Sequence, residues 1–209
     1  MRKELWSRLF HIALFFYTVA NAADAQPLYK DGSEPVEERV SDLLARMTLE
    51  EKIMQLDIFW GREVAKMKGH EAESASEKKM KETIGTTGIG SVHDLYPLNV
   101  STANAIQKYA VENTRLGIPV IMIEEGLHGY CVLGSTSFPV PLQIASMWDT
   151  SLVHQIGRVI GTESRSHGIH MILAPVLGLA RDSRWGRVEE TYGEDPYLTA
   201  LCRTDPLLL

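Results

Sequence analysis

The stretch GIHMILAPVLGLARDSRWGRVEETYGEDP, residues 168–196, decides the fold. It begins with an apolar run over 168–174 that is typical of a buried strand, and Pro175 ends this run. Alternating guanidinium and carboxylate groups follow between Arg181 and Asp195. An α/β protein places its polar site at the carboxyl end of a strand in this way. We therefore expect the charged segment to belong to a functional site.

Two further apolar runs, near 88–95 and 118–123, precede this stretch, and a helical pattern separates each run from the next. The first pattern covers 99–115. The second begins where Asp149 is placed to cap a helix. Its apolar stripe consists of Leu152, Val153, Ile156, Val159 and Ile160. The βαβαβ order predicts an α/β fold with buried parallel strands.

The other segments suggest packing elements and solvated surface. Apolar residues recur at helical spacing from Val36 to Met47, just after Pro35, which predicts a helix there. Residues 66–82 are rich in Lys, Glu and Ser, and we interpret them as a solvated helix or loop. The glycines over 85–90 precede an apolar run, which is the reverse of the order in a dinucleotide-binding motif.

A second polar cluster, EEGLHG at 124–129, follows the run at 118–123. Successive side chains on a strand point to opposite faces, so Glu124 and Glu125 are not expected to flank one bond. One of them can face a pocket while the other pairs with a surrounding helix. Spacing alone does not choose between the two.

These motifs resemble those of glycoside hydrolase family 3, the β-glucosidase and β-xylosidase family. RDSRWGRVEETYGEDP is similar to its signature RDPRWGRxxExxxEDP, EEGLHG to its (D/E)xxHG motif, and VSDLLARMTLEEKIMQL to its N-terminal segment. The resemblance covers roughly Leu28 to Ala200. It implies that residues 26–200 are an incomplete N-terminal part of a (β/α)₈ barrel of TIM type.

The resemblance also implies a retaining exo-β-glycosidase that acts on a small oligosaccharide or β-glycoside. β-Glucosidase is the first expectation and β-xylosidase the second. Glu125, three residues before the motif's His, would accept hydrogen bonds from two hydroxyls of the terminal sugar, and Arg187 would donate to them. His128 and Trp185 are further candidates for sugar contact. No cofactor is implied.

The catalytic groups of this mechanism are a carboxylate nucleophile and a carboxyl acid/base. The resemblance puts both beyond Leu209. Residues 201–209 depart from the family pattern and are interpreted as an aberrant tail from a frame shift or truncation. A complete barrel needs about 250 residues, so we predict that this chain is aggregation-prone and does not hydrolyse glycosides. Asp182 and Arg184 are expected to hold their loop together.

Residues 1–25 have the basic, apolar and small-residue order of a signal peptide, which predicts export to the periplasm or the cell exterior. The apolar core of this segment is too short for stable membrane insertion. A formal net charge of −6 without a basic cluster argues against nucleic acid as a partner. Cys131 and Cys202 are too few for a disulfide framework, and we expect unpaired thiols, although one bridge is possible.

No metal is predicted, because His154, His167 and His170 lack a metal-binding spacing. Two other functions stay open. One is a non-catalytic sugar-binding module that uses Glu125, Trp185 and Arg187. The other is a complete hydrolase of another type, which would bring two carboxylates close together in one pocket. Its candidates are Glu125, Glu189, Glu190 and Glu194.

Overall fold

The computed structural model describes residues 26–69, 71–96 and 99–203, and these form two units that divide after Thr48. The predicted signal peptide and residues 204–209 of the predicted tail lie outside the described residues. The first unit contains η1 (Leu28–Lys30) and α2 (Val36–Arg46), which confirms the helix expected after Pro35. The Tyr29 backbone N–H donates to Asp42 at 3.1 Å and joins the two elements.

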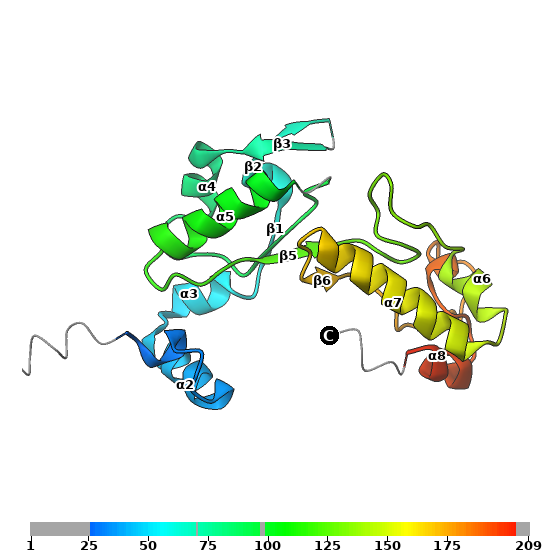
Figure 1. The fold of residues 1–209 in the computed structure, drawn as a ribbon. Coiled ribbons are helices and arrows are strands. Elements are labelled where there is room, and N and C mark those ends of the chain that lie inside the picture. The colour runs from blue at the N-terminus through cyan, green and yellow to red at the C-terminus, as the bar shows by residue number, and fades with distance from the viewer. Residues whose placement is uncertain (1–25, 70, 97–98, 204–209) are drawn as a thin grey trace, which may run out of the picture. The chain divides into compact units, whose positions relative to one another are not determined.

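The second unit is built on a parallel sheet whose strands follow the order β1-β4-β5-β6 (Figure 1). The pairs Val92 with Met122 and Ile123 with Met171 set its register. All three predicted strands are present, although each is shorter than its apolar run, and β1 was not predicted. The strand bounds are β1 Ile58–Trp60, β4 Ser91–His93, β5 Ile121–Glu124 and β6 Met171–Ile172.

Helices connect and flank these strands. Asn99 caps α5 by accepting from the Thr102 N–H at 2.8 Å, and Asp149 caps α7 by accepting from the Leu152 N–H at 3.1 Å. Both helices were predicted, whereas the short α6 was not. The helices are α3 Leu49–Met54, η2 Gly61–Glu63, α4 Glu77–Thr83, α5 Val100–Asn113, α6 Pro141–Ala145, α7 Thr150–Ser166, η3 Val188–Glu190 and α8 Pro196–Arg203.

The interpretation of residues 66–82 as a solvated helix or loop is wrong for their first half. An antiparallel hairpin of β2 (Ala65–Lys68) and β3 (Glu71–Ala75) occupies it, and α4 follows. Ala65 is buried and Met67 is half-buried, while the lysines between and after them are exposed. This alternation is that of a strand with one buried face, and the high charge of the segment hid it.

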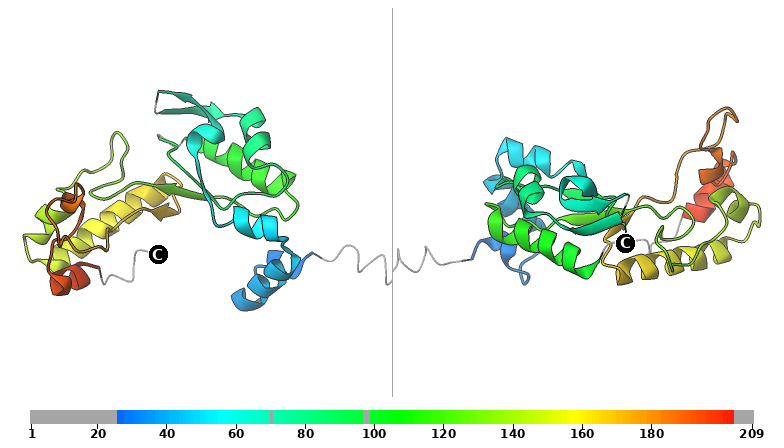
Figure 2. Two further views of the ribbon diagram at one scale, coloured as in Figure 1. Left: turned by 180° about the vertical axis from the view of Figure 1, so that it is seen from behind. Right: turned by 90° about the horizontal axis from the view of Figure 1, so that it is seen from above.

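Two apolar clusters form the core of the second unit. The larger lies between the sheet, α4, α5 and the hairpin, and includes Val92, Ile106 and Met122. The smaller joins α6, α7 and α8, which lie together in both views of Figure 2. Of the predicted stripe on α7, Val153, Ile156 and Ile160 are buried. Leu152 and Val159 remain exposed, so the buried stripe is narrower than expected.

Candidate active site

The carboxyl end of β5 separates the two neighbouring glutamates. Glu124, the last residue of β5, is 1 % exposed, whereas Glu125 is half-buried. The Glu125 backbone N–H donates to the Tyr96 hydroxyl at 3.3 Å, and its carbonyl accepts from the Cys131 N–H at 3.3 Å. Glu125 is the more accessible carboxylate, and Glu124 is enclosed.

The turn after Glu125 depends on Gly129. Its φ of +131° and the 2.2 Å between an ideal Cβ and the Thr136 carbonyl oxygen leave no room for a side chain. The neighbouring His128 carbonyl accepts from the Phe138 N–H at 2.7 Å. His128 and Gly129 line a shallow pocket of about 220 Å³ with residues 130–132 and 135–137. The close backbone approach at Gly129 therefore gives this loop its shape.

The charged loop after β6 is ordered by two ion pairs. Arg184 forms an ion pair with Asp182. Its Nη2 donates to Oδ2 at 2.6 Å and its Nε donates to Oδ1 at 3.0 Å. This agrees with the loop-holding role expected of that pair. Arg187 forms an ion pair with Glu190, and its Nε lies 2.8 and 2.9 Å from the two carboxylate oxygens. Trp185 lies between the two arginines and is 43 % exposed, so its ring can meet a ligand.

Glu125 and Arg187 are far apart in the sequence, and no hydrogen bond or ion pair joins them in the structure; the Glu125 charge has only a small effect on the guanidinium. The hydrogen bond and the charge of Glu190 raise the pKa of the Arg187 guanidinium, and the charge of Glu125 adds to the effect. The Arg187 side chain is 63 % exposed. A half-buried carboxylate near an accessible planar donor can orient a ligand with several hydroxyl groups.

The other acidic residues of the loop do not form a second carboxylate site. Glu189 and Glu194 are exposed, and Glu190 is paired with Arg187. None of the three lines the pocket beside His128 or the larger pocket described below, and neither do Glu125, Trp185 and Arg187. The hypothesis that these glutamates supply two catalytic carboxylates in one pocket therefore gains no support.

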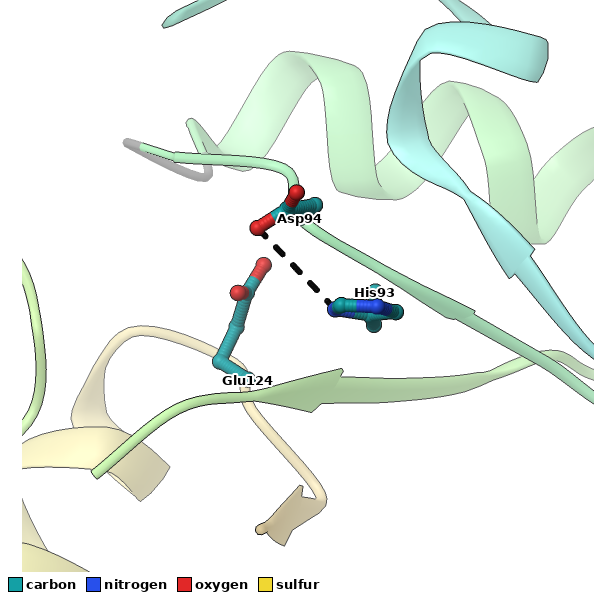
Figure 3. A group of neighbouring side chains, drawn as sticks. All are labelled: His93, Asp94 and Glu124. Carbon is teal, nitrogen blue, oxygen red and sulfur yellow. Dashed lines mark ion pairs between the residues drawn. The ribbon is translucent and has the colours of Figure 1, made fainter. Parts of the chain in front are cut away.

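The sequence analysis missed a cluster of His93, Asp94 and Glu124 (Figure 3). Oε1 of Glu124 accepts from the Leu95 N–H at 2.7 Å, while Oε2 has no hydrogen-bond partner. Burial raises the pKa of Glu124 to about 7. One signal could have revealed the cluster. His93 and Asp94 end one predicted strand and Glu124 follows the next, so parallel pairing brings them together.

Asp94 also lines a pocket of about 460 Å³ with Met67, Gly69 and Tyr96. Trp60 and Arg62 complete its wall, and the guanidinium of Arg62 lies 4.9 Å from the Trp60 ring centroid. Aromatic and charged side chains are therefore combined near the carboxyl ends of β1 and β4.

The three histidines considered as metal ligands have separate positions in the described part of the chain. His170 Nδ1 accepts from the Met122 N–H at 3.0 Å, and His167 Nδ1 lies 2.9 Å from the Glu163 carbonyl oxygen. His154 is on α7.

Both Cys131, which is exposed, and Cys202, which is buried, are free thiols. Among the described residues, we find no helix with the length and apolar character needed to cross a membrane.

Comparison with known proteins identifies relatives along most of the chain. The model of the glycosyl hydrolase family 3 N-terminal domain matches residues 48–204. A protein of Formosa agariphila that carries the name of a β-xylosidase is 36 % identical over 202 residues, which are 95 % of this chain and 27 % of that protein. The periplasmic β-glucosidase of Salmonella typhimurium is 32 % identical over 78 % of this chain and 19 % of its own length.

Solved structures that resemble this chain are also β-glucosidases. A β-glucosidase from Erythrobacter marinus matches 86 % of this chain and 23 % of its own, at a TM-score of 0.72 and 29 % identity. A β-glucosidase from Listeria innocua in complex with glucose matches 79 % of this chain and 22 % of its own, at a TM-score of 0.63 and 30 % identity. The chain thus spans less than a third of the length of each of these relatives.

Proposed function

The chain belongs to glycoside hydrolase family 3, with the barrel-like α/β fold of its N-terminal domain, and from this premise we propose that it forms part of the sugar site of a retaining exo-β-glycosidase. The substrate would be a small oligosaccharide or β-glycoside with a terminal glucose or, as the second expectation, xylose. The names of the relatives include both β-glucosidases and β-xylosidases, which supports this range.

The observation that carries the proposal is that both motif residues present accessible polar groups, the half-buried Glu125 carboxylate just after β5 and the 63 % exposed Arg187 guanidinium that Glu190 holds. Two motifs about sixty residues apart in the sequence would then serve one ligand. Glu125 would accept hydrogen bonds from neighbouring hydroxyls of the sugar, and Arg187 would donate to them through its planar fork. His128 and Trp185 would contribute at the edges of the same site.

Binding alone does not cleave the glycosidic bond. A retaining glycosidase needs a nucleophilic carboxylate and a second carboxyl acid/base, about 5–5.5 Å apart. We assign neither role to a described residue, and we expect both groups beyond Leu209. The proposed part of this chain is therefore to hold and orient the terminal sugar while other residues perform the chemistry.

Calorimetric titration of the purified chain with glucose and with xylose tests the sugar site. From this partial barrel we expect weak but saturable binding that Glu125→Gln and Arg187→Lys both weaken further, because the first removes the charged acceptor and the second removes the planar donor fork. Asp182→Asn is the matched control, since it disrupts the other ion pair of the loop and should leave affinity unchanged. Equal affinity in the wild type, E125Q and R187K would refute the site.

Catalysis is tested separately with a chromogenic β-glucoside. We expect no turnover by the isolated chain, and turnover that persists through purification would contradict the assignment of the catalytic groups.

The alternative of a non-catalytic sugar-binding module predicts tight glucose or xylose binding by a soluble, cooperatively folding chain. Calorimetry and thermal unfolding distinguish such a module from a chain that depends on further segments.

We also propose that the protein is exported. The order of residues 1–25 supports this, as does the periplasmic location in the name of the Salmonella typhimurium relative. Expression in a bacterial host, fractionation and N-terminal sequencing test the proposal. A mature N-terminus near residue 26 in the periplasmic or external fraction is expected, and an intact Met1 in the cytoplasm would contradict it.

A further inference from the structure

The ends of β4 and β5 bring together an imidazole and two carboxylates. His93 and Asp94 come from the end of β4 and the residue after it, and Glu124 ends β5. His93 Nδ1 lies 4.0 Å from Asp94 Oδ1, and one ligand atom from each of the three residues lies within 4.8 Å of the others. In Figure 3, the carboxylates of Asp94 and Glu124 point toward each other, with the His93 ring beside them.

Two atoms of this cluster are buried without a hydrogen bond. They are Oε2 of Glu124 and Nδ1 of His93. The Glu124 side chain is almost wholly enclosed. The Tyr96 hydroxyl and the Asp94 N–H lie close enough to lower the pKa of Glu124, but neither has the geometry of a hydrogen bond to Oε2. Buried polar atoms usually have partners, because leaving one unpaired costs about 1–3 kcal/mol. Both atoms are therefore available to contact a bound group.

The unpaired atoms are held in place by contacts outside the cluster. The Leu95 N–H fixes Oε1 of Glu124 at 2.7 Å and leaves Oε2 directed elsewhere. The Trp60 ring packs against the His93 ring, with their centroids 4.6 Å apart, and restricts the imidazole. Ligands of a metal ion are typically fixed by such surrounding contacts.

We propose that His93, Asp94 and Glu124 bind one divalent transition-metal ion of the zinc or manganese class. Imidazole nitrogen suits zinc, and carboxylate oxygens suit zinc and manganese. Two ionised carboxylates and a neutral imidazole carry a charge of −2, which a divalent cation neutralises. Because Asp94 also lines the pocket of about 460 Å³, the ion has an entry path and a position for a water ligand.

The geometry requires only a small contraction. Zinc ligands lie about 2.0–2.2 Å from the metal, so two ligands of a tetrahedral site are about 3.4 Å apart. The His93 Nδ1–Asp94 Oδ1 separation of 4.0 Å exceeds this by about 0.6 Å, and no pair of the three ligand atoms exceeds it by more than about 1.4 Å, so binding requires small side-chain rotations, chiefly of the more exposed Asp94. The site is separate in chemistry from the proposed sugar site, because it uses Glu124 and leaves Glu125 unchanged.

Titration of the chelator-treated chain with Zn²⁺ and with Mn²⁺ tests the proposal. We expect calorimetry to show saturation at one equivalent for at least one of these ions, and thermal unfolding to shift upward because the ion binds the folded state. Co²⁺ added in place of zinc should give a visible ligand-field spectrum. This readout requires neither glycosidase activity nor a variant.

Three substitutions locate the ion. Glu124→Gln keeps the shape and the acceptor for Leu95, and His93→Ala removes the nitrogen ligand; each should weaken binding by roughly tenfold or more. Glu125→Gln, one residue away, should bind the ion as the wild type does. Absence of one-equivalent binding by the wild type, or unchanged binding in both E124Q and H93A, would overturn the site. Circular dichroism establishes that each variant is folded.

Discussion

The carboxylate of Glu190 holds the guanidinium of Arg187 through Nε, at 2.8 and 2.9 Å, and through Nη2. Nη1 has no hydrogen-bond partner among the described residues. The same side chain is thus held by Glu190 at one edge and is 63 % exposed. Glu190, three residues along the chain, acts as a positioning residue for the proposed sugar donor.

Glu190→Ala should lower the affinity for glucose or xylose by up to about fivefold, because Arg187 must then be ordered at binding. This corresponds to about 1 kcal/mol, the upper range for an exposed ion pair. The melting temperature should change little. Calorimetric titration of E190A beside D182N checks the prediction. An equal loss in both variants would mean that general loop order matters, and not the orientation of Arg187.

Cys131 offers a chemical reporter of Glu125. Burial raises the pKa of its thiol, and the charges of Glu125 and Glu124 raise it further. Alkylation by iodoacetamide should therefore require a higher pH than for an ordinary thiol, since only the thiolate reacts. Glu125→Gln should lower this pKa and speed alkylation at pH 8.

Mass spectrometry can follow both thiols in one sample. The pKa of Cys202 is raised by burial alone, so its alkylation should also be slower than that of an ordinary thiol. It should not respond to E125Q and therefore serves as the internal control. An identical pH profile for Cys131 in the wild type and E125Q would show that Glu125 does not influence this thiol.

Periodicity predicted the parts of the fold that local physics determines. The strand positions, α5, and α7 with its Asp149 cap were all predicted, because buried runs, helical periodicity and a capping side chain are visible in the sequence. The β2–β3 hairpin was missed because charged side chains on its exposed face dominate the composition. Strand β1 was missed because it has only three residues and no flanking pattern.

The residues of the candidate site were predictable only where they belong to a recognisable sequence motif. Glu125 and Arg187 came from motif resemblance, and the effect of one charge on the other depends on the tertiary fold, which no local pattern encodes. The enclosed position of Glu124 depends on the Leu95 N–H, 29 residues earlier, and on the register of β4 with β5. Tertiary pairing of this kind is not visible in a single sequence.

Arg115→Ala should destabilise the chain by about 3 kcal/mol, because it leaves the carboxylate of Glu51 buried with its main charge partner removed. Glu51 has a side chain only 3 % exposed, and Arg115 donates to it through Nε at 2.7 Å and through Nη2. Urea unfolding followed by circular dichroism gives the free energy of unfolding. Arg115→Lys should retain part of the stability. A loss below about 0.5 kcal/mol in R115A would refute this account.

Thr136→Val should alter how stability depends on pH. The Thr136 hydroxyl and N–H donate to Glu163 at 2.6 and 2.9 Å and lower its pKa from 4.5. A lowered pKa in the folded state adds stability above pH 4.5, which is lost as the pH falls through the folded value. T136V keeps only the N–H donor, so its melting temperature should fall less between pH 6 and acidic pH. Parallel curves for T136V and the wild type would contradict this role.

Gly129→Ala and Gly161→Ala should change stability in opposite directions. At Gly129 a Cβ would meet the Thr136 carbonyl at 2.2 Å in a backbone conformation with φ of +131°, so we expect a loss of at least about 2 kcal/mol. At Gly161, within α7, a Cβ meets nothing within 4 Å, and alanine should add up to about 1 kcal/mol through helix propensity. Urea unfolding measures both changes. Because glycine at 129 is required by a backbone contact, enlarging the space around Thr136 with Thr136→Gly should not rescue G129A. Rescue would show that side-chain crowding, and not the carbonyl, sets the requirement.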